Sequence, residues 1–200
     1  MPLPILPSDL AAPAGESLRS LARLATAEGL ADPFLRLESL GERPPDPLRS
    51  GFEAVTYRFH GGGRLRGYRL WVRLPRGDEA TVGRELPADR PPVVLSPDGG
   101  TLAAVLAGEA FGAKGAVETR TPILFLQLTL QPGARLFLPV PEEHTLFAHV
   151  LDGRVQTGPA WDEIGEGQLG AFRKDGAAVG FAIPGRNDPA ELLLFGGAFH

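Results

Sequence analysis

The chain has 200 residues, of which 43% are hydrophobic and 22% are charged, and its formal net charge is −4. This mildly acidic composition gives no general attraction to nucleic acid or anionic membranes, and the lack of cysteine excludes disulfides, thiolate nucleophiles and cysteine-ligated metals. No run of about 18 apolar residues occurs, and the opening MPLPILPSDL lacks the basic region of a signal peptide. We therefore expect a cytoplasmic protein with no membrane partner.

Residues 16–30 are the first element in chain order and the best helix candidate, because Leu18, Leu21, Ala22 and Ala25 could share one helical face. Extended chain is the alternative for this segment. After it, 26 glycines and 20 prolines divide the sequence into short segments. Many short strands separated by turn residues are typical of an all-β sandwich or barrel.

Residues 50–75 predict a β-hairpin. Two alternating runs flank Gly61, Gly62 and Gly63, which permit the positive φ angles of a tight reversal. The alternation predicts one apolar face on each strand. We expect this face to be partly exposed and to bind a protein partner or a second subunit through Val55, Tyr57, Leu70 and Val72.

The same hairpin carries a set of arginines that predicts a basic face: Arg58, Arg64, Arg66, Arg69 and Arg73. Nucleic-acid contact is one interpretation of this set. A solvated outer face of a sheet is favoured, because no aromatic residues interleave with the arginines as they do in proteins that bind single strands. Nucleic acid is therefore not an expected partner.

From about residue 100 onward, apolar runs and turn residues predict one complete small barrel. We expect a truncated N-terminal β unit in residues 1–98 and this barrel in residues 99–200. The predicted barrel strands fall in residues 101–112, 121–133, 135–140, 144–155, 168–172, 177–184 and 190–199.

The sequence resembles the pirin family of bicupin proteins over most of its length. The similarity is clearest in LAGEAFGAKGAVETRTPILFLQLTLQPGA (106–134), which contains the motif Thr119-Arg120-Thr121-Pro122, and it continues through VLDGRV (150–155), IGEGQLGAF (164–172) and AELLLFGG (190–197). Upstream, DPFLRLESLG (32–41), GFEAVTY (51–57) and LRGYRLWVRLP (65–75) follow the order of the pirin N-terminal half. The resemblance implies a cupin-type barrel packed on a truncated cupin-like sheet.

The departures from the family concern its metal site. Pirins have two histidines in a His-Pro-His-Arg-Gly-Phe-Glu stretch, and the matching residues here begin Asp46-Pro47-Leu48. Aspartate can bind iron, whereas leucine has no donor atom. The family's remaining ligands lie between two strands that are joined directly here by the triple glycine, so the resemblance implies that the N-terminal metal site is lost. In the C-terminal half, the equivalent positions fall near Val140, Glu142 and Leu146, and a metal is not expected there either.

We therefore expect no cofactor and assign no catalytic residue. The leading hypothesis is a metal-free, regulatory binding protein that recognises a protein partner or a small apolar ligand in the C-terminal barrel. The alternative is a quercetinase-type dioxygenase that holds iron, nickel or manganese at a rearranged site, Asp46 with His60 or Glu142 with His144. Of the other histidines, His149 is expected to pack in the core and His200 to lie at a mobile end.

Overall fold

The computed structural model describes residues 32–40, 45–61, 63–158, 160–172, 177–185 and 188–198, and these residues are all strand, turn or loop. The all-β class expected from the sequence is thereby confirmed. The helix candidate at residues 16–30 and His200 lie outside the described residues. Within the described part of the chain, no helix is long and apolar enough to cross a membrane. The cytoplasmic location stays a prediction.

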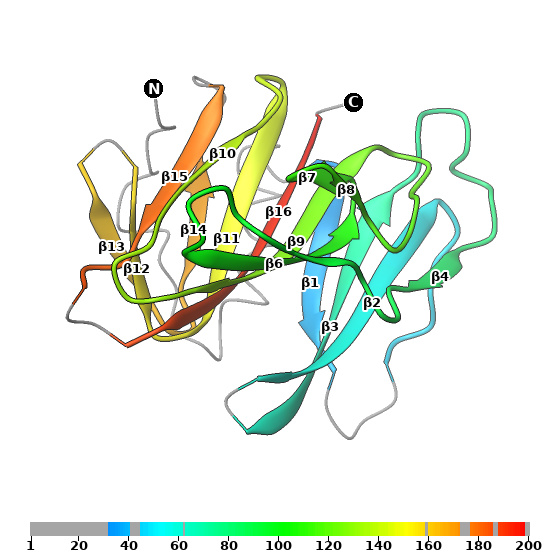
Figure 1. Cartoon of the computed structure of the whole chain (residues 1–200). Helices are drawn as coiled ribbons and strands as arrows, with labels where there is room; N and C mark the ends of the chain where they lie inside the picture. Colours follow the sequence, from blue (N-terminus) through cyan, green and yellow to red (C-terminus); the bar gives the residue numbers. More distant parts are fainter. Residues whose placement is uncertain are drawn as a thin grey trace.

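Three layers of sheet make up the molecule (Figure 1). One outer sheet has the order β1-β3-β2-β4, with strands β1 (Phe34–Ser39), β3 (Arg64–Arg73), β2 (Phe52–Gly61) and β4 (Arg84–Pro87). The central sheet has the order β14-β11-β16-β9-β6-β5, with strands β14 (Leu169–Phe172), β11 (His144–Asp152), β16 (Ala190–Ala198), β9 (Ile123–Leu130), β6 (Thr101–Ala107) and β5 (Val93–Leu95).

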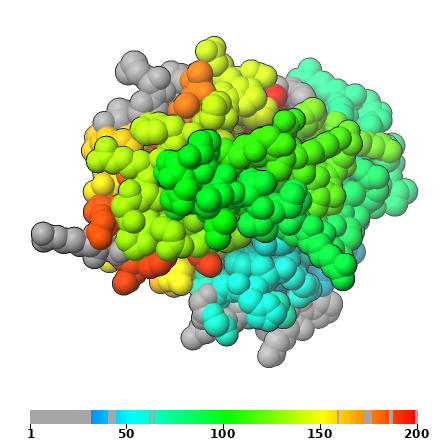
Figure 2. Space-filling view, viewed as in Figure 1, coloured from blue at the N-terminus to red at the C-terminus, as the bar shows by residue number. Residues whose placement is uncertain are grey.

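The other outer sheet has the order β10-β15-β12-β13, with strands β10 (Arg135–Pro139), β15 (Ala178–Ala182), β12 (Arg154–Thr157) and β13 (Asp162–Gly165). It closes against the central sheet to form the C-terminal barrel. A small two-stranded sheet pairs β7 (Glu109–Ala110) with β8 (Ala113–Lys114). Green segments, around residues 100 to 130, cross the middle of the face seen in Figure 2, between the yellow and orange barrel and the cyan sheet.

Both faces of the central sheet are buried at β16. In β16, Leu192 and Leu194 point into the barrel core, while Leu193 and Phe195 pack against the β1-β3-β2-β4 sheet. A strand that is covered on both faces must be apolar at consecutive positions, which explains the run of leucines. The two cores therefore share one central sheet and hold the two halves of the chain together.

The hairpin predicted from residues 50–75 is confirmed. β2 and β3 pair without interruption from Phe52 opposite Arg73 to Gly61 opposite Arg64. Gly63 has a φ of 73°, which the tight reversal requires. Gly61 has a separate role, because a Cβ atom at this position would lie 2.5 Å from Oε2 of Glu191 on β16.

The Thr-Arg-Thr-Pro motif joins the two halves of the chain. The backbone N–H of Arg120 donates to Oε2 of the buried Glu53 at 2.8 Å, and Oγ1 of Thr121 donates to the carbonyl of Arg73 at 2.5 Å. Arg84 also donates to Glu53, at 2.7 Å. The motif thus attaches the segment before β9 to both strands of the hairpin.

The division into residues 1–98 and 99–200 stays a prediction. Strand β5 lies before that boundary in the sequence, yet it pairs with β6 at the edge of the central sheet, with Leu95 opposite Leu102. The central sheet therefore includes residues from both sides of the predicted boundary.

Candidate functional site

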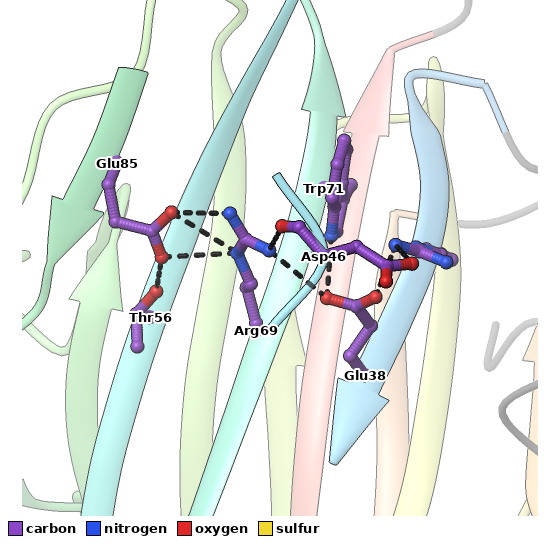
Figure 3. A network of polar contacts seen from close by, with 7 residues as sticks. Glu38, Asp46, Thr56, Arg69, Trp71 and Glu85 are labelled. Atoms are coloured by element: carbon purple, nitrogen blue, oxygen red, sulfur yellow. Dashed lines mark hydrogen bonds and ion pairs between the residues drawn. The ribbon is translucent and has the colours of Figure 1, made fainter. Parts of the chain in front are cut away.

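A cluster of polar side chains lies on the outer face of the β1-β3-β2-β4 sheet, with the guanidinium of Arg69 at its centre (Figure 3). The Arg69 side chain is only 3% exposed. It donates to Oε2 of Glu85 at 2.6 Å and to the backbone carbonyl of Asp46 at 2.6 Å, and its Nη1 lies 3.4 Å from Oε2 of Glu38. Three elements that are distant in sequence thus converge on one buried cation.

A second cation extends the cluster. Arg36 forms an ion pair with Glu38 and donates to Oδ2 of Asp46 at 2.8 Å. The guanidinium carbons of Arg36 and Arg69 lie 4.7 Å and 4.8 Å from the ring centre of Trp71, which itself donates to Glu38 at 2.9 Å. The hydrogen bond from Arg36 lowers the pKa of Asp46 below its usual value. Trp71 is therefore contacted by both cations.

The residues in this cluster do not fit a metal site of the kind that the family resemblance implies. Asp46 occupies a predicted ligand position, but its carboxylate is bonded to Arg36 and its carbonyl to Arg69. Leu48 has no donor atom. Three carboxylates (Glu38, Asp46 and Glu85) face two guanidinium groups, so little net negative charge is left to attract a divalent cation.

Neither alternative pair of metal ligands belongs to a larger group of possible ligands among the residues that the structure describes. His60 is exposed and lies on β2, four residues from Thr56, which is opposite Arg69. Four strand residues span about 13 Å, so His60 is distant along the strand from the level of the Arg69 cluster, which includes Asp46. Glu142 lies in the turn between β10 and β11 and is exposed, and His144 is the first residue of β11. Among the described residues, no group of three or more histidines and carboxylates is placed to hold a metal ion.

The prediction that these five arginines form one basic face is wrong in part. Arg58 and Arg73 are exposed, but Arg69 is buried in the polar cluster, and Arg66 donates to the carbonyl of Leu151 at 2.8 Å. Arg66 and Arg69 point to opposite sides of the sheet, because side chains alternate along a strand. The side chain of Arg64 lies outside the described part of the chain.

The predicted interaction surface is buried by the protein's own chain. Val55, Leu70 and Val72 have no exposed surface, and Tyr57 is 7% exposed. These four side chains belong to the core between the hairpin and the central sheet, where they meet residues such as Phe125, Phe147 and Phe195. The central sheet covers the face that we expected a partner to cover. Exposed apolar side chains occur elsewhere, for example Val93 and Leu95 on the edge strand β5 and Leu102 on its neighbour β6.

Sequence analysis did not find Glu38, Glu85 and Trp71 as partners of Arg69. The two glutamates lie 31 and 16 residues from Arg69 in the chain, so no local spacing connects them. The available signal was a charged residue on each of three strands of this sheet, β1, β3 and β4. That signal indicates that the three side chains belong to one sheet, but it does not show that they contact one another.

His149 packs in the protein as predicted. It is 6% exposed, its Nδ1 lies 3.3 Å from the carbonyl of Gln168, and its ring meets Tyr68 edge-on at 6.2 Å. Burial lowers the pKa of His149, although the contact with Gln168 acts in the opposite direction. Arg66, Tyr68 and Glu166 lie in the same region of the surface.

This pKa predicts a dependence of stability on pH. Below the ordinary histidine pKa of 6.5 the unfolded chain binds a proton that folded His149 does not accept, so the free energy of unfolding should fall as the pH is lowered from 7 towards 5. Above pH 7 both states are neutral at this residue and the effect vanishes. Urea unfolding at several pH values should show a shallower pH dependence in His149→Phe than in the wild type. His60→Gln, at an exposed histidine, should retain the wild-type slope; equal slopes in all three proteins would contradict the assignment.

The chain is similar in sequence to several curated proteins of one family, although no family model matches it. Human pirin is 34% identical over 172 residues, which cover 64% of this chain and 58% of human pirin. Pirin-1 of Arabidopsis thaliana is 29% identical over 163 residues, with 62% and 57% covered. The pirin-like protein of Caulobacter vibrioides is 32% identical over 148 residues, with 70% and 48% covered. The chain thus matches about half to three fifths of the length of these curated relatives.

Two solved structures share the fold. Quercetin 2,3-dioxygenase from Acinetobacter baumannii superposes with a TM-score of 0.68 at 21% identity, over 86% of this chain and 77% of that one. The protein GK1651 from Geobacillus kaustophilus superposes with a TM-score of 0.67 at 19% identity, over 99% of this chain and 94% of its own. The first protein is a cupin-fold enzyme, in agreement with the predicted cupin-type barrel. The two solved structures agree in fold, and the sequence relatives assign this chain to the pirin family.

Proposed function

We propose that this protein acts as a binding protein that needs no metal ion. The observation that carries the proposal is the buried guanidinium of Arg69, which Glu85 and the carbonyl of Asp46 hold at 2.6 Å each. This guanidinium lies against the segment in which the family resemblance places metal ligands. The sheet that would carry a metal site is organised around a fixed cation instead.

A binding role at the surface is favoured over an apolar ligand inside the barrel. Phe172 and Phe181 meet edge-to-face at 5.9 Å within the barrel core, together with side chains such as Leu126 and Leu146 that have no exposed surface. These side chains fill the interior, as in a packed protein core. We therefore place the binding function on the outside of the barrel, either for a small ligand or for a protein partner.

Metal analysis tests the proposal. Protein purified without an affinity tag should contain far less than one iron, nickel or manganese ion per chain. Adding each ion to EDTA-treated protein should leave the melting temperature unchanged, whereas an ion present at 100 times its dissociation constant would stabilise the fold by about 2.7 kcal/mol, or roughly 5–10 °C.

A metal-dependent dioxygenase is the outcome that would overturn this proposal. It requires close to one ion per chain, and that ion should be lost in His60→Ala or His144→Ala. Glu163→Gln provides a control, because this exposed side chain pairs with Arg154 on β12 and belongs to neither candidate ligand pair.

A further inference from the structure

A cleft of about 240 Å³ lies where the β1-β3-β2-β4 sheet meets the central sheet. It is open to solvent on one side and receives side chains from the end of β1, from β3, from β11 and from the turn after β13. The residues that matter for its chemistry are Ser39, Arg66, Tyr68, His149, Leu151 and Glu166. Neither the polar cluster around Arg69 nor the family's metal segment contributes to this cleft.

His149 brings an unpartnered nitrogen to the cleft. The residue is 6% exposed, and its Nδ1 is directed at the carbonyl of Gln168. A carbonyl oxygen only accepts hydrogen bonds, so Nδ1 carries the proton and Nε2 carries the lone pair. Nε2 has no hydrogen-bond partner among the residues that the structure describes. His149 lines the cleft, and a ring lone pair that is left without a partner favours a ligand that donates a hydrogen bond to it.

A second, larger hollow of about 720 Å³ adjoins the cleft and shares Glu166 with it. Three further carboxylates line this hollow: Asp152, Asp188 and Glu191. Oε2 of Glu191 is a buried atom that accepts no hydrogen bond from the described residues. Burial is the main cause that raises the pKa of Glu191.

The charges around the cleft leave an excess of acid. Arg66 lies 3.9 Å from Glu191 and 4.0 Å from Asp152, and it donates to the carbonyl of Leu151, so its charge is balanced within the protein. Arg154, which lines the larger hollow, pairs with Glu163 at 3.0 Å. Within the described part of the chain, Glu166 and Asp188 have no basic partner. The net field at the shared edge of the two hollows is therefore negative.

We propose that this cleft binds a small organic cation, whose ammonium group donates hydrogen bonds to Nε2 of His149 and to the carboxylate of Glu166. The proposal deepens the metal-independent binding function and rests on it. An ammonium group carries only donors. The cleft offers it an imidazole lone pair and a carboxylate, which only accept, and the hydroxyls of Tyr68 and Ser39, which can accept as well as donate. A carboxylate ligand of the same size would face Glu166 and is disfavoured by like charge.

Calorimetric titration of the full chain with 1,4-diaminobutane tests the proposal. The protein is first treated with EDTA, and its metal content is measured on the same sample. We expect saturable binding that weakens at least about tenfold in His149→Phe and in Glu166→Gln, because each removes one hydrogen bond to a charged group. His149→Phe retains a planar ring for packing, and Glu166 is exposed, so both variants should fold. Glu142→Gln, at an exposed glutamate elsewhere, should bind like the wild type.

Other outcomes overturn the proposal. These are the absence of saturable binding, equal binding of butyrate, and binding that neither variant weakens. A metal-free sample that fails to bind the diamine rejects this inference alone, whereas close to one metal ion per chain rejects the proposed function whatever the diamine does.

Discussion

Replacing Arg69 with alanine should lower the free energy of unfolding by about 3 kcal/mol, because the change leaves Glu38 and Glu85 without the cation between them. The side chain is 3% exposed, so water cannot readily replace the lost hydrogen bonds. Removal of a buried charge from an ion pair costs more than removal of an exposed one, but the Glu85 side chain is 42% exposed and Glu38 keeps Arg36, so the expected cost lies at the lower end of the range for a broken buried pair. Urea unfolding at pH 7 measures the effect directly, and the melting temperature should fall by roughly 6–12 °C.

Two variants separate this contact from a general effect of charge. Arg58→Ala removes an exposed arginine from the neighbouring strand and should change stability by less than about 0.5 kcal/mol. Arg69→Lys keeps the charge but cannot reach Glu85 and the Asp46 carbonyl together, so its stability should lie between the wild type and the alanine variant. An Arg69→Ala variant as stable as Arg58→Ala would show that the cluster does not hold the sheet together.

The strands were predictable because their signals are local. Residues 177–184 and 190–199 correspond to β15 (Ala178–Ala182) and β16 (Ala190–Ala198), and the alternation around the triple glycine corresponds to β2 and β3. Such alternation depends only on neighbouring residues and on the two-residue repeat of a strand. It also gave the correct faces: Val55 and Leu70 do lie on one side of the hairpin.

What covers each face was not predictable, since that depends on contacts distant in sequence. Val55 and Leu70 are apolar whether a partner or the central sheet covers them, and only the structure places Phe195 against this face. The same limit applies to Arg69. Its position on the outer face was evident from the alternation. The ion pair with Glu38 was not predictable, because 31 residues separate the two in the sequence. His149 was predicted correctly because a histidine that alternates with Phe147 and Leu151 shares a buried face.

Leu70→Ala tests directly whether the apolar face of the hairpin is an internal core. Leu70 has no exposed surface and packs between β2, β3 and the central sheet, so its truncation should cost about 3 kcal/mol through lost burial and the cavity left behind. The loss should appear in urea unfolding of the isolated protein and should not depend on protein concentration.

Leu65 provides a matched control on the same strand, because it is the same residue type and is 62% exposed. Leu65→Ala should change stability by less than about 0.5 kcal/mol. If the hairpin face were an interface between subunits, Leu70→Ala would weaken association and its cost would grow as the protein is diluted. A cost for Leu70→Ala that equals that of Leu65→Ala in the monomer would contradict the three-layer packing. The difference between the two leucines therefore measures how much of the fold depends on the central sheet covering the hairpin.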